Sequence, residues 1–160
     1  MGISQAAGIT LAVTASAAVP YRIELTDTPD PSMRDLLADA LLTYNEAMLG
    51  RSDLRPLALP IRGADDGRII GGLWGRTSFR WLYVELLFVP EILRGRQIGT
   101  QLLTLAEAEA RSRGCLGSWL DTFSLKAYRF YEAQGYELFG EISEYPPGNS
   151  RRSLLKRFGK

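Results

Sequence analysis

Residues 86–103, LLFVPEILRGRQIGTQLL, hold the pattern that decides the fold of this chain. An apolar run ends at Pro90, an Arg- and Gly-rich loop follows, and apolar residues then return at helical spacing. A strand that passes through such a loop into a helix presents successive backbone N–H groups at the helix N-terminus. The stretch therefore predicts a cradle for an anion, most naturally a phosphate.

Apolar periodicity and turn residues along the whole chain predict the element order β-α-β-β-β-α-β-α-β-β. The first helix is expected to start after Ser32, a favourable N-cap, and to end at Gly50. The other helices are expected at 98–113 and 124–134, and the strands at 21–25, 57–62, 68–74, 81–89, 115–120, 136–142 and 152–157. This order indicates a mixed α/β sheet.

The composition is that of a soluble globular protein with one domain. The 160 residues carry 19 Lys and Arg against 18 Asp and Glu, so no strong field favours nucleic acid or an anionic membrane as a partner. The single cysteine, Cys115, fits a reducing compartment, and we expect a cytoplasmic protein. Because the chain has no histidine, the commonest metal ligand and general base, we expect no metal.

Residues 1–19 contain an apolar run of small residues that resembles a targeting segment. A signal peptide needs a positively charged start, and the first basic residue here is Arg22, beyond that run. The run is also too short and too rich in Ala, Thr and Ser to span a bilayer. We therefore expect residues 1–19 to be an N-terminal extension, flexible or laid on the surface, and residues 20–160 to form one domain.

The loop at residues 94–100, RGRQIGT, matches neither the P-loop nor the dinucleotide-binding fingerprint. It resembles the pyrophosphate loop, R/Q-x-x-G-x-G/A, of the GNAT superfamily of acyl-coenzyme A-dependent N-acyltransferases. Residues 127–136, AYRFYEAQGY, resemble a second block of this family, and residues 119–124 and 145–148 resemble a bacterial subgroup of largely unassigned substrate. The resemblance covers nearly the full chain and implies a mixed, mainly antiparallel sheet flanked by helices, with acetyl-CoA as cosubstrate.

The resemblance also implies how the coenzyme is held. Backbone N–H groups of residues 96–100, with the charges of Arg94 and Arg96, would bind the pyrophosphate. The strand end at residues 87–89 would pair its backbone with the pantetheine arm and donate an N–H to the thioester oxygen. The implied coenzyme-binding residues are Leu87, Phe88, Val89, Arg94, Gly95, Arg96, Gln97, Ile98, Gly99, Thr100, Ser124, Ala127 and Tyr128.

Gln97 departs from the family pattern, because the motif usually carries its first glycine at this position. If the position requires positive φ or a close approach to phosphate, a Gln costs on the order of 1 kcal/mol and crowds the ligand. We expect weakened but retained coenzyme binding, since Gly95 and Gly99 remain.

Three side chains are candidates for catalysis. Tyr131 stands at the family's Tyr position, which implies a general acid; without the motif it would be interpreted as a core aromatic. Glu85 is the only charge in the run 81–89, so it either serves as a general base in a cleft or pairs with an arginine such as Arg76 or Arg80. Asp121 is a second candidate base, unless residues 121–124 form a helix-capping turn.

The implied reaction is transfer of an acetyl group to a primary amine of a small molecule or protein, by direct attack in a ternary complex. Residues 45–55 and 144–149 are expected to select the acceptor. Cys115 is expected in the core, which disfavours an acyl-cysteine route. The alternative is a non-catalytic acyl-CoA-binding module with a regulatory or protein-interaction role, which Gln97 favours. A homodimer through the late strands near Tyr145 stays open.

Overall fold

The computed structural model describes residues 20–159, so the predicted extension at residues 1–19 lies outside the described residues. The chain divides into two units, the first ending at Met48 and the second beginning at Leu49. In the first unit, the predicted strand at residues 21–25 is wrong, because Ile23 alone forms an isolated bridge. The side chains of residues 21–25 are exposed, so this segment has no buried face to hold it in a sheet.

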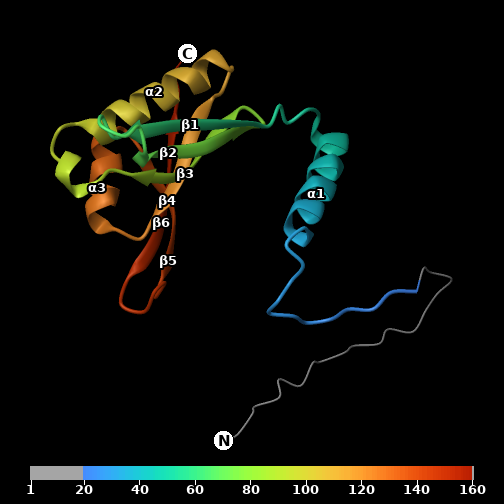
Figure 1. The fold of residues 1–160 in the computed structure, drawn as a ribbon. Helices are drawn as coiled ribbons and strands as arrows, with labels where there is room; N and C mark the ends of the chain where they lie inside the picture. The colour runs from blue at the N-terminus through green and yellow to red at the C-terminus, as the bar shows by residue number, and fades with distance from the viewer. Residues whose placement is uncertain (1–19, 160) are drawn as a thin grey trace, which may run out of the picture. The chain divides into compact units, whose positions relative to one another are not determined.

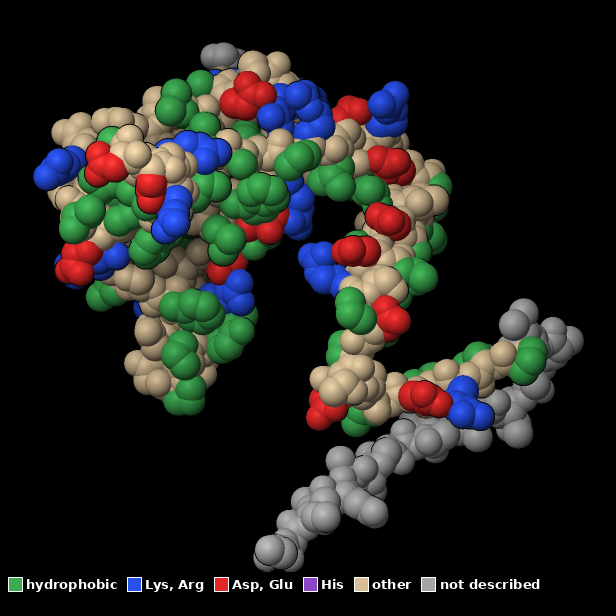
Figure 2. Space-filling view, viewed as in Figure 1, with side chains coloured by type: hydrophobic (Ala, Val, Ile, Leu, Met, Phe, Trp, Pro, Cys, Tyr) green, Lys and Arg blue, Asp and Glu red, His purple; other side chains and the backbone are tan. Residues whose placement is uncertain are grey.

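Helix α1 (Met33–Leu49) is the main element of the first unit. Ser32 occupies the predicted N-cap position, where its carbonyl accepts from the N–H of Leu36 at 3.0 Å. Its hydroxyl, however, donates to Asp30 at 2.6 Å, and this hydrogen bond lowers the pKa of the Asp30 carboxyl. The apolar residues of the predicted helix face stay solvent-accessible, since α1 contains no buried residue. Figure 2 shows acidic, basic and hydrophobic side chains interspersed along it.

The second unit is built on a six-stranded sheet with the order β1-β2-β3-β4-β6-β5 (Figure 1). Every neighbouring pair is antiparallel except β3 and β4, which are parallel and joined through helix α2. This confirms the mixed, mainly antiparallel sheet. The elements are β1 (Arg55–Arg62), β2 (Ile69–Ser78), β3 (Trp81–Phe88), a 3-10 turn (Glu91–Leu93), α2 (Ile98–Ser112), β4 (Gly117–Thr122), α3 (Leu125–Ala133), β5 (Glu137–Ser143) and β6 (Ser150–Arg157).

Helices α2 and α3 contribute to one core with the sheet, because their buried residues belong to a single cluster with those of five strands. Leu82, Leu103, Leu120 and Leu154 are the large side chains at its centre, each at most 1 % exposed. Ala106 and Ala110 are fully buried on α2, so this helix lies close against the strands. The helical spacing of these residues is what the sequence predicted for residues 98–113.

A buried ion pair connects α2 to β6. Glu107 on α2 is 5 % exposed, and Lys156 donates to its two carboxylate oxygens at 2.7 and 2.9 Å. Arg111 lies 3.7 Å from the same carboxylate but is far more exposed. A charge at this depth is tolerated only with a partner, so the pair fixes the helix against the far strands of the sheet.

Strand β3 changes direction at Glu85. Trp74 of β2 pairs with Leu86 and Gly75 pairs with Val84, so Glu85 is the extra residue of a β-bulge. The parallel pairing of β3 with β4 also ends at Val84, although β3 continues to Phe88. A bulge bends its strand and disrupts the ladder. Beyond this point, the edge of β3 that faces β4 has no strand partner among residues 20–159.

Within residues 20–159, no helix is long and apolar enough to cross a membrane. No group of three or more His, Cys, Asp or Glu side chains in that range is arranged to hold a metal ion.

Candidate active site

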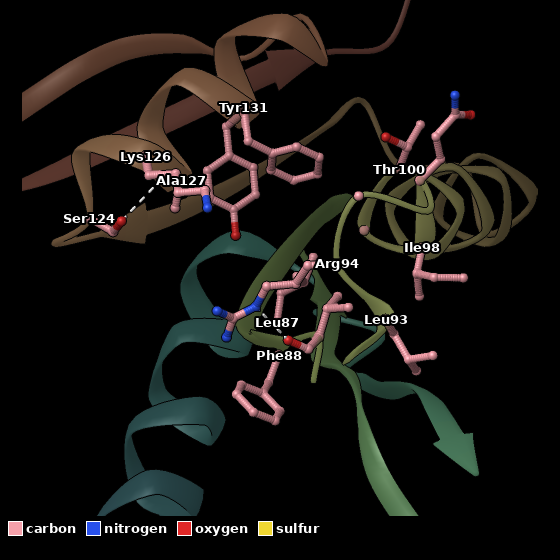
Figure 3. A pocket seen from close by; sticks show the side chains of 15 residues that line it. Leu87, Phe88, Leu93, Arg94, Ile98, Thr100, Ser124, Lys126, Ala127 and Tyr131 are labelled. Atoms are coloured by element: carbon pink, nitrogen blue, oxygen red, sulfur yellow. Dashed lines mark hydrogen bonds between the residues drawn. The ribbon is translucent and has the colours of Figure 1, made fainter. Parts of the chain in front are cut away.

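A pocket of about 650 Å³ opens where β3 has lost its pairing with β4 (Figure 3). Its walls come from the end of β3, the following loop, the first turn of α2, and α3 with its N-cap. The lining residues are Leu87, Phe88, Val89, Leu93, Arg94, Gly95, Gln97, Ile98, Gly99, Thr100, Ser124, Lys126, Ala127, Phe130 and Tyr131.

The first turn of α2 supplies hydrogen-bond donors to this pocket. Gln97 is the N-cap, with φ 60° in the left-handed region, and its side chain makes no capping hydrogen bond. The helical bonding begins with the N–H of Gln101, which donates to the carbonyl of Gln97 at 3.0 Å. The N–H groups of residues 98–100 therefore have no acceptor within the helix and stand at the positive end of its dipole. This is the arrangement that binds phosphate in other proteins.

The loop before α2 adds one arginine to the pocket wall. Arg94 donates from Nε to the carbonyl of Val89 at 3.0 Å, which holds its guanidinium beside the end of β3. Figure 3 shows this guanidinium facing the space below Tyr131. Arg96 is exposed and is not among the lining residues.

Tyr131 reaches the pocket from the core side. It is 7 % exposed, and Figure 3 shows its hydroxyl at the tip of a ring that extends from α3 toward β3 and Arg94. Burial, with a smaller contribution from the negative charge of Asp121, raises the pKa of Tyr131 to about 12. The phenol is therefore neutral, and able to donate a hydrogen bond, over the whole physiological pH range. The two interpretations from the sequence, core aromatic and site residue, are both consistent with this position.

The raised pKa of Tyr131 predicts a loss of stability in alkali. The unfolded chain releases this proton near pH 10 and the folded chain near pH 12, so the folded state binds more protons between those values. The contribution is intact below about pH 10, and on the order of 2–3 kcal/mol is lost as the pH rises to about 12. Urea unfolding at several alkaline pH values should show a shallower decline for Tyr131→Phe than for the unaltered protein. An equal decline in the free energy of unfolding of the two proteins would contradict the raised pKa of Tyr131.

The two candidate carboxylates stand outside the lining of this pocket. Glu85 pairs with Arg76, one of the two arginine partners weighed from the sequence. Asp121 accepts from Nε of Arg151 at 2.7 Å, and Tyr83 lies at 3.5 Å from its other oxygen. Tyr83 stacks on Trp119, with ring centroids 3.9 Å apart.

The capping turn suggested for residues 121–124 forms around a different residue from Asp121. Ser124 is the N-cap of α3 and accepts from the N–H of Ala127 at 3.2 Å. Its own N–H donates to the hydroxyl of Thr122. Asp121 is thus left to its ion pair with Arg151.

Most of the predicted coenzyme-binding residues line the pocket, and Arg96 and Tyr128 do not. Tyr128 instead donates from its hydroxyl to Glu132 at 2.7 Å. Sequence reasoning missed Leu93, Lys126 and Phe130. Helical spacing could have found Phe130, because it lies one turn after Lys126 and next to Tyr131. A Cβ at Gly99 would lie 3.1 Å from the Phe130 ring, so glycine lets the first turn of α2 approach this ring closely.

Cys115 lies in the core as expected, at 8 % exposure. Burial raises the pKa of its thiol, which makes it a poor nucleophile.

The mainly antiparallel sheet, with its one parallel pair connected through α2, agrees with the fold that the resemblance to the GNAT acyltransferases implied. The chain belongs to the Acetyltransferase (GNAT) family, whose sequence profile matches residues 21–136.

Named relatives agree with this membership. Acetyltransferase Atu2258 of Agrobacterium fabrum is 45 % identical over 134 residues, which is 84 % of this chain and 97 % of the relative. Blasticidin-S acetyltransferase of Streptomyces morookaense is 42 % identical over 91 residues, 56 % of this chain and 67 % of the relative. A crystal structure of an acetyltransferase from Agrobacterium tumefaciens superposes with a TM-score of 0.79 at 45 % identity, covering 84 % of this chain and 97 % of that chain. The protein is thus an acyl-CoA-dependent acetyltransferase.

The pocket fits acetyl-CoA, the cosubstrate of such acetyltransferases. The uncapped N–H groups of residues 98–100 suit a pyrophosphate, and the unpaired edge of β3 suits the amide-bearing pantetheine arm. Both features are formed by backbone atoms that have no partner within their own helix or sheet.

Proposed function

We propose that this protein transfers the acetyl group of acetyl-CoA to a primary amine of a small molecule or protein, by direct attack of the amine in a ternary complex. The observation that carries the proposal is the position of Tyr131. Its neutral hydroxyl extends into a pocket that also has the open edge of β3 and the N-terminus of α2. A donor for the sulfur, a donor for the carbonyl oxygen and a phosphate cradle thus belong to one site.

Different groups of the chain are proposed to bind the pyrophosphate, the thioester oxygen and the sulfur. N–H groups of residues 98–100 and the Arg94 guanidinium hold the pyrophosphate, while an N–H of residues 87–89 bonds the thioester oxygen as negative charge develops there. Acetyl-CoA supplies the activated acyl group. Tyr131 donates a hydrogen bond to the departing thiolate.

The proton balance limits what Tyr131 contributes. With a pKa of about 12, Tyr131 is a weaker acid than a thiol, whose ordinary pKa is about 8.5. Full transfer from the phenol would therefore be unfavourable by itself. The attacking amine loses one proton and the leaving thiolate gains one, so Tyr131 is proposed to stabilise the thiolate until that proton reaches it.

The proposed general base remains Glu85 or Asp121. Both carboxylates are held by arginines, at Arg76 and Arg151, and both lie on strands next to the point where β3 and β4 separate. A carboxylate fixed in this way can orient a water that accepts the amine proton. We place the reaction in the cytoplasm, in agreement with the single buried thiol.

The acceptor is proposed to be an organic amine, selected within the second unit by residues 144–149. The name of the Streptomyces morookaense relative states that it acts on blasticidin S, so this compound belongs in a first panel of amines. Simple polyamines, amino acids and peptides with free N-termini complete the panel.

The test is calorimetric titration with acetyl-CoA followed by turnover across this amine panel. Binding together with release of free coenzyme A on addition of one amine would support the proposal. Binding without turnover in any amine would favour the alternative, a non-catalytic acyl-CoA-binding module. No binding would overturn the assignment of the pocket.

The alternative function rests on Gln97, a non-glycine residue in the left-handed region at the centre of the proposed phosphate cradle. We expect Gln97→Gly to raise the free energy of unfolding by about 1 kcal/mol, because glycine adopts positive φ without strain. We also expect several-fold tighter binding of acetyl-CoA, since a side chain leaves the pocket wall. Calorimetry and urea unfolding measure the two effects.

Gln134→Gly is the matched control, because Gln134 also caps a helix but has φ −90°. Here glycine relieves no strain, and stability should fall. Unchanged or weaker coenzyme binding in Gln97→Gly would mean that the Gln97 amide contributes a hydrogen bond of its own.

A further inference from the structure

A second pocket, of about 250 Å³, lies at the other end of α2. It is lined by Arg51, Arg55, Arg80 and Arg113 together with Asp53, and we refer to it as the basic pocket. Its residues come from the start of β1, the β2–β3 turn and the end of α2. Because α2 contains 15 residues, the basic pocket is separated from the first turn of α2 by about 20 Å.

The charge of the basic pocket contrasts with the rest of the chain. Four arginines against one aspartate give its lining a formal charge of +3, whereas the whole protein carries +1. Glu109 pairs with Arg113 at 2.7 Å and reduces the local charge to +2. Asp53 pairs with Arg51 at 3.4 Å, but both side chains are more than 70 % exposed, so this pair is weak.

Arg55 and Arg80 are available to a ligand, whereas Arg113 is not. Arg113 is committed to the fold, because it also donates to the carbonyl of Pro56 at 3.1 Å and to the hydroxyl of Thr77 at 3.2 Å. Arg80 uses Nε to bond the carbonyl of Gly114, which leaves its terminal nitrogens. Within residues 20–159, neither Arg55 nor Arg80 has a carboxylate within 4.0 Å.

Two small polar residues also line the basic pocket. Ser52 is 2 % exposed and Thr77 is 3 % exposed. A concave pocket that is lined by guanidinium groups and polar residues is suited to a tetrahedral oxyanion.

The turn that contains Arg80 has backbone angles that non-glycine residues adopt unfavourably. Ser78 pairs with Trp81, so Phe79 and Arg80 form a two-residue hairpin loop. Their φ values are 46° and 63°, the positive values of a type I′ turn, in which Asn-Gly is the favoured sequence. Left-handed conformations of non-glycine residues cost on the order of 1 kcal/mol each. The protein therefore has an arginine at the pocket although glycine would be more stable in this turn.

The C-terminus of α2 alone would repel an anion. Its dipole is equivalent to about half a negative charge, which is small beside the arginine charges at the basic pocket. Arg80 also donates to the carbonyl of Gly114, two residues beyond the end of α2, which reduces the repulsion further.

We propose that the basic pocket binds a phosphate group, either as inorganic phosphate or as the phosphate of a small phosphomonoester. Arg55 and Arg80 bond the phosphate oxygens at the rim, and the site is separate from the coenzyme pocket. The concave shape and the small net charge of the protein favour a small ligand over a nucleic acid, whose binding needs an extended basic surface.

The test follows backbone amide shifts of the ¹⁵N-labelled protein during titration at constant ionic strength, with inorganic phosphate in one arm and glycerol 3-phosphate in the other. We expect saturable shifts in residues 51–55, 77–80 and 113–115. Tighter binding in the second arm would identify a phosphomonoester as the ligand, and equal binding would identify inorganic phosphate. Residues 96–100 report separately on the coenzyme pocket.

Arg80→Gly is the decisive variant, because glycine suits the turn and keeps the protein folded. We expect phosphate affinity at the basic pocket to fall about tenfold, the effect of one charge-assisted hydrogen bond, with no loss of stability in urea. Arg62→Gln is the control, since Arg62 stands at the other end of β1 and bonds Gly67. Absence of saturable shifts at the basic pocket, or an equal loss of affinity in both variants, would overturn the proposal. Failure here leaves acetyl-CoA binding, measured calorimetrically, unaffected.

Discussion

Replacing Tyr131 by Phe is expected to lower the turnover number by about 100-fold or more, because a preorganised hydrogen-bond donor to a developing negative charge typically contributes 10²- to 10³-fold. The aromatic ring stays, so the core contact and the pocket wall are preserved. The dissociation constant of acetyl-CoA should change little, since the cradle at residues 98–100 is formed by backbone atoms. Steady-state kinetics with the amine found in the panel, together with calorimetry, separate the two effects.

Tyr136→Phe is the control for this substitution. Tyr136 is also buried, its ring centroid lies 5.9 Å from that of Tyr131, and it does not line the coenzyme pocket. Its variant should retain normal turnover. A Tyr131→Phe enzyme with undiminished turnover would exclude the hydroxyl from the chemistry and leave Tyr131 as a packing residue.

Replacing Lys156 by Met is expected to lower the free energy of unfolding by about 3 kcal/mol, because it leaves the buried Glu107 carboxylate without its closest cation. Arg111 at 3.7 Å limits the loss, since it can recover part of the interaction. Urea unfolding near pH 7 measures the effect.

Two further variants serve as controls for the Lys156→Met substitution. Lys126→Met removes an exposed lysine that has no ion pair within residues 20–159, and it should cost little. The double variant Glu107→Leu, Lys156→Met should recover most of the lost stability, because a buried ion pair can be replaced by apolar side chains at small cost. A single Lys156→Met variant as stable as the unaltered protein would show that Glu107 needs no partner at this depth.

The sequence predicted nearly all of the elements of the second unit, because each has a strong local signal. The apolar run at 81–89 and the periodic residues at 98–113 correspond to β3 and α2 within two residues at each end. The strand at 21–25 failed because short alternation carries little information without a neighbouring strand. The local sequence pattern does not show which residues of two strands pair, so it could not predict the bulge at Glu85.

The candidate site was predictable where it depends on glycine and charge spacing. The loop at 94–100 and the tyrosine at 131 stand in one pocket because strand, loop and helix are consecutive or packed together. The partners of Glu85 and Asp121 were less accessible, because Arg151 lies 30 residues from Asp121 in the chain and is brought close only by the pairing of β4 with β6. The basic pocket gave no motif, since its arginines are spread from residue 51 to residue 113.

The pocket proposed for acetyl-CoA offers hydrogen-bond donors mainly through the main chain, at the first turn of α2 and the free edge of β3. Main-chain atoms are the same for every amino acid, so most substitutions along these segments leave the donors in place. Natural selection can therefore alter the side chains around the amine acceptor while the main-chain groups that would bind acetyl-CoA are inherited unchanged. Relatives that share fewer than half of their residues can therefore differ in the amine that they acetylate and still bind the acyl donor in the same way.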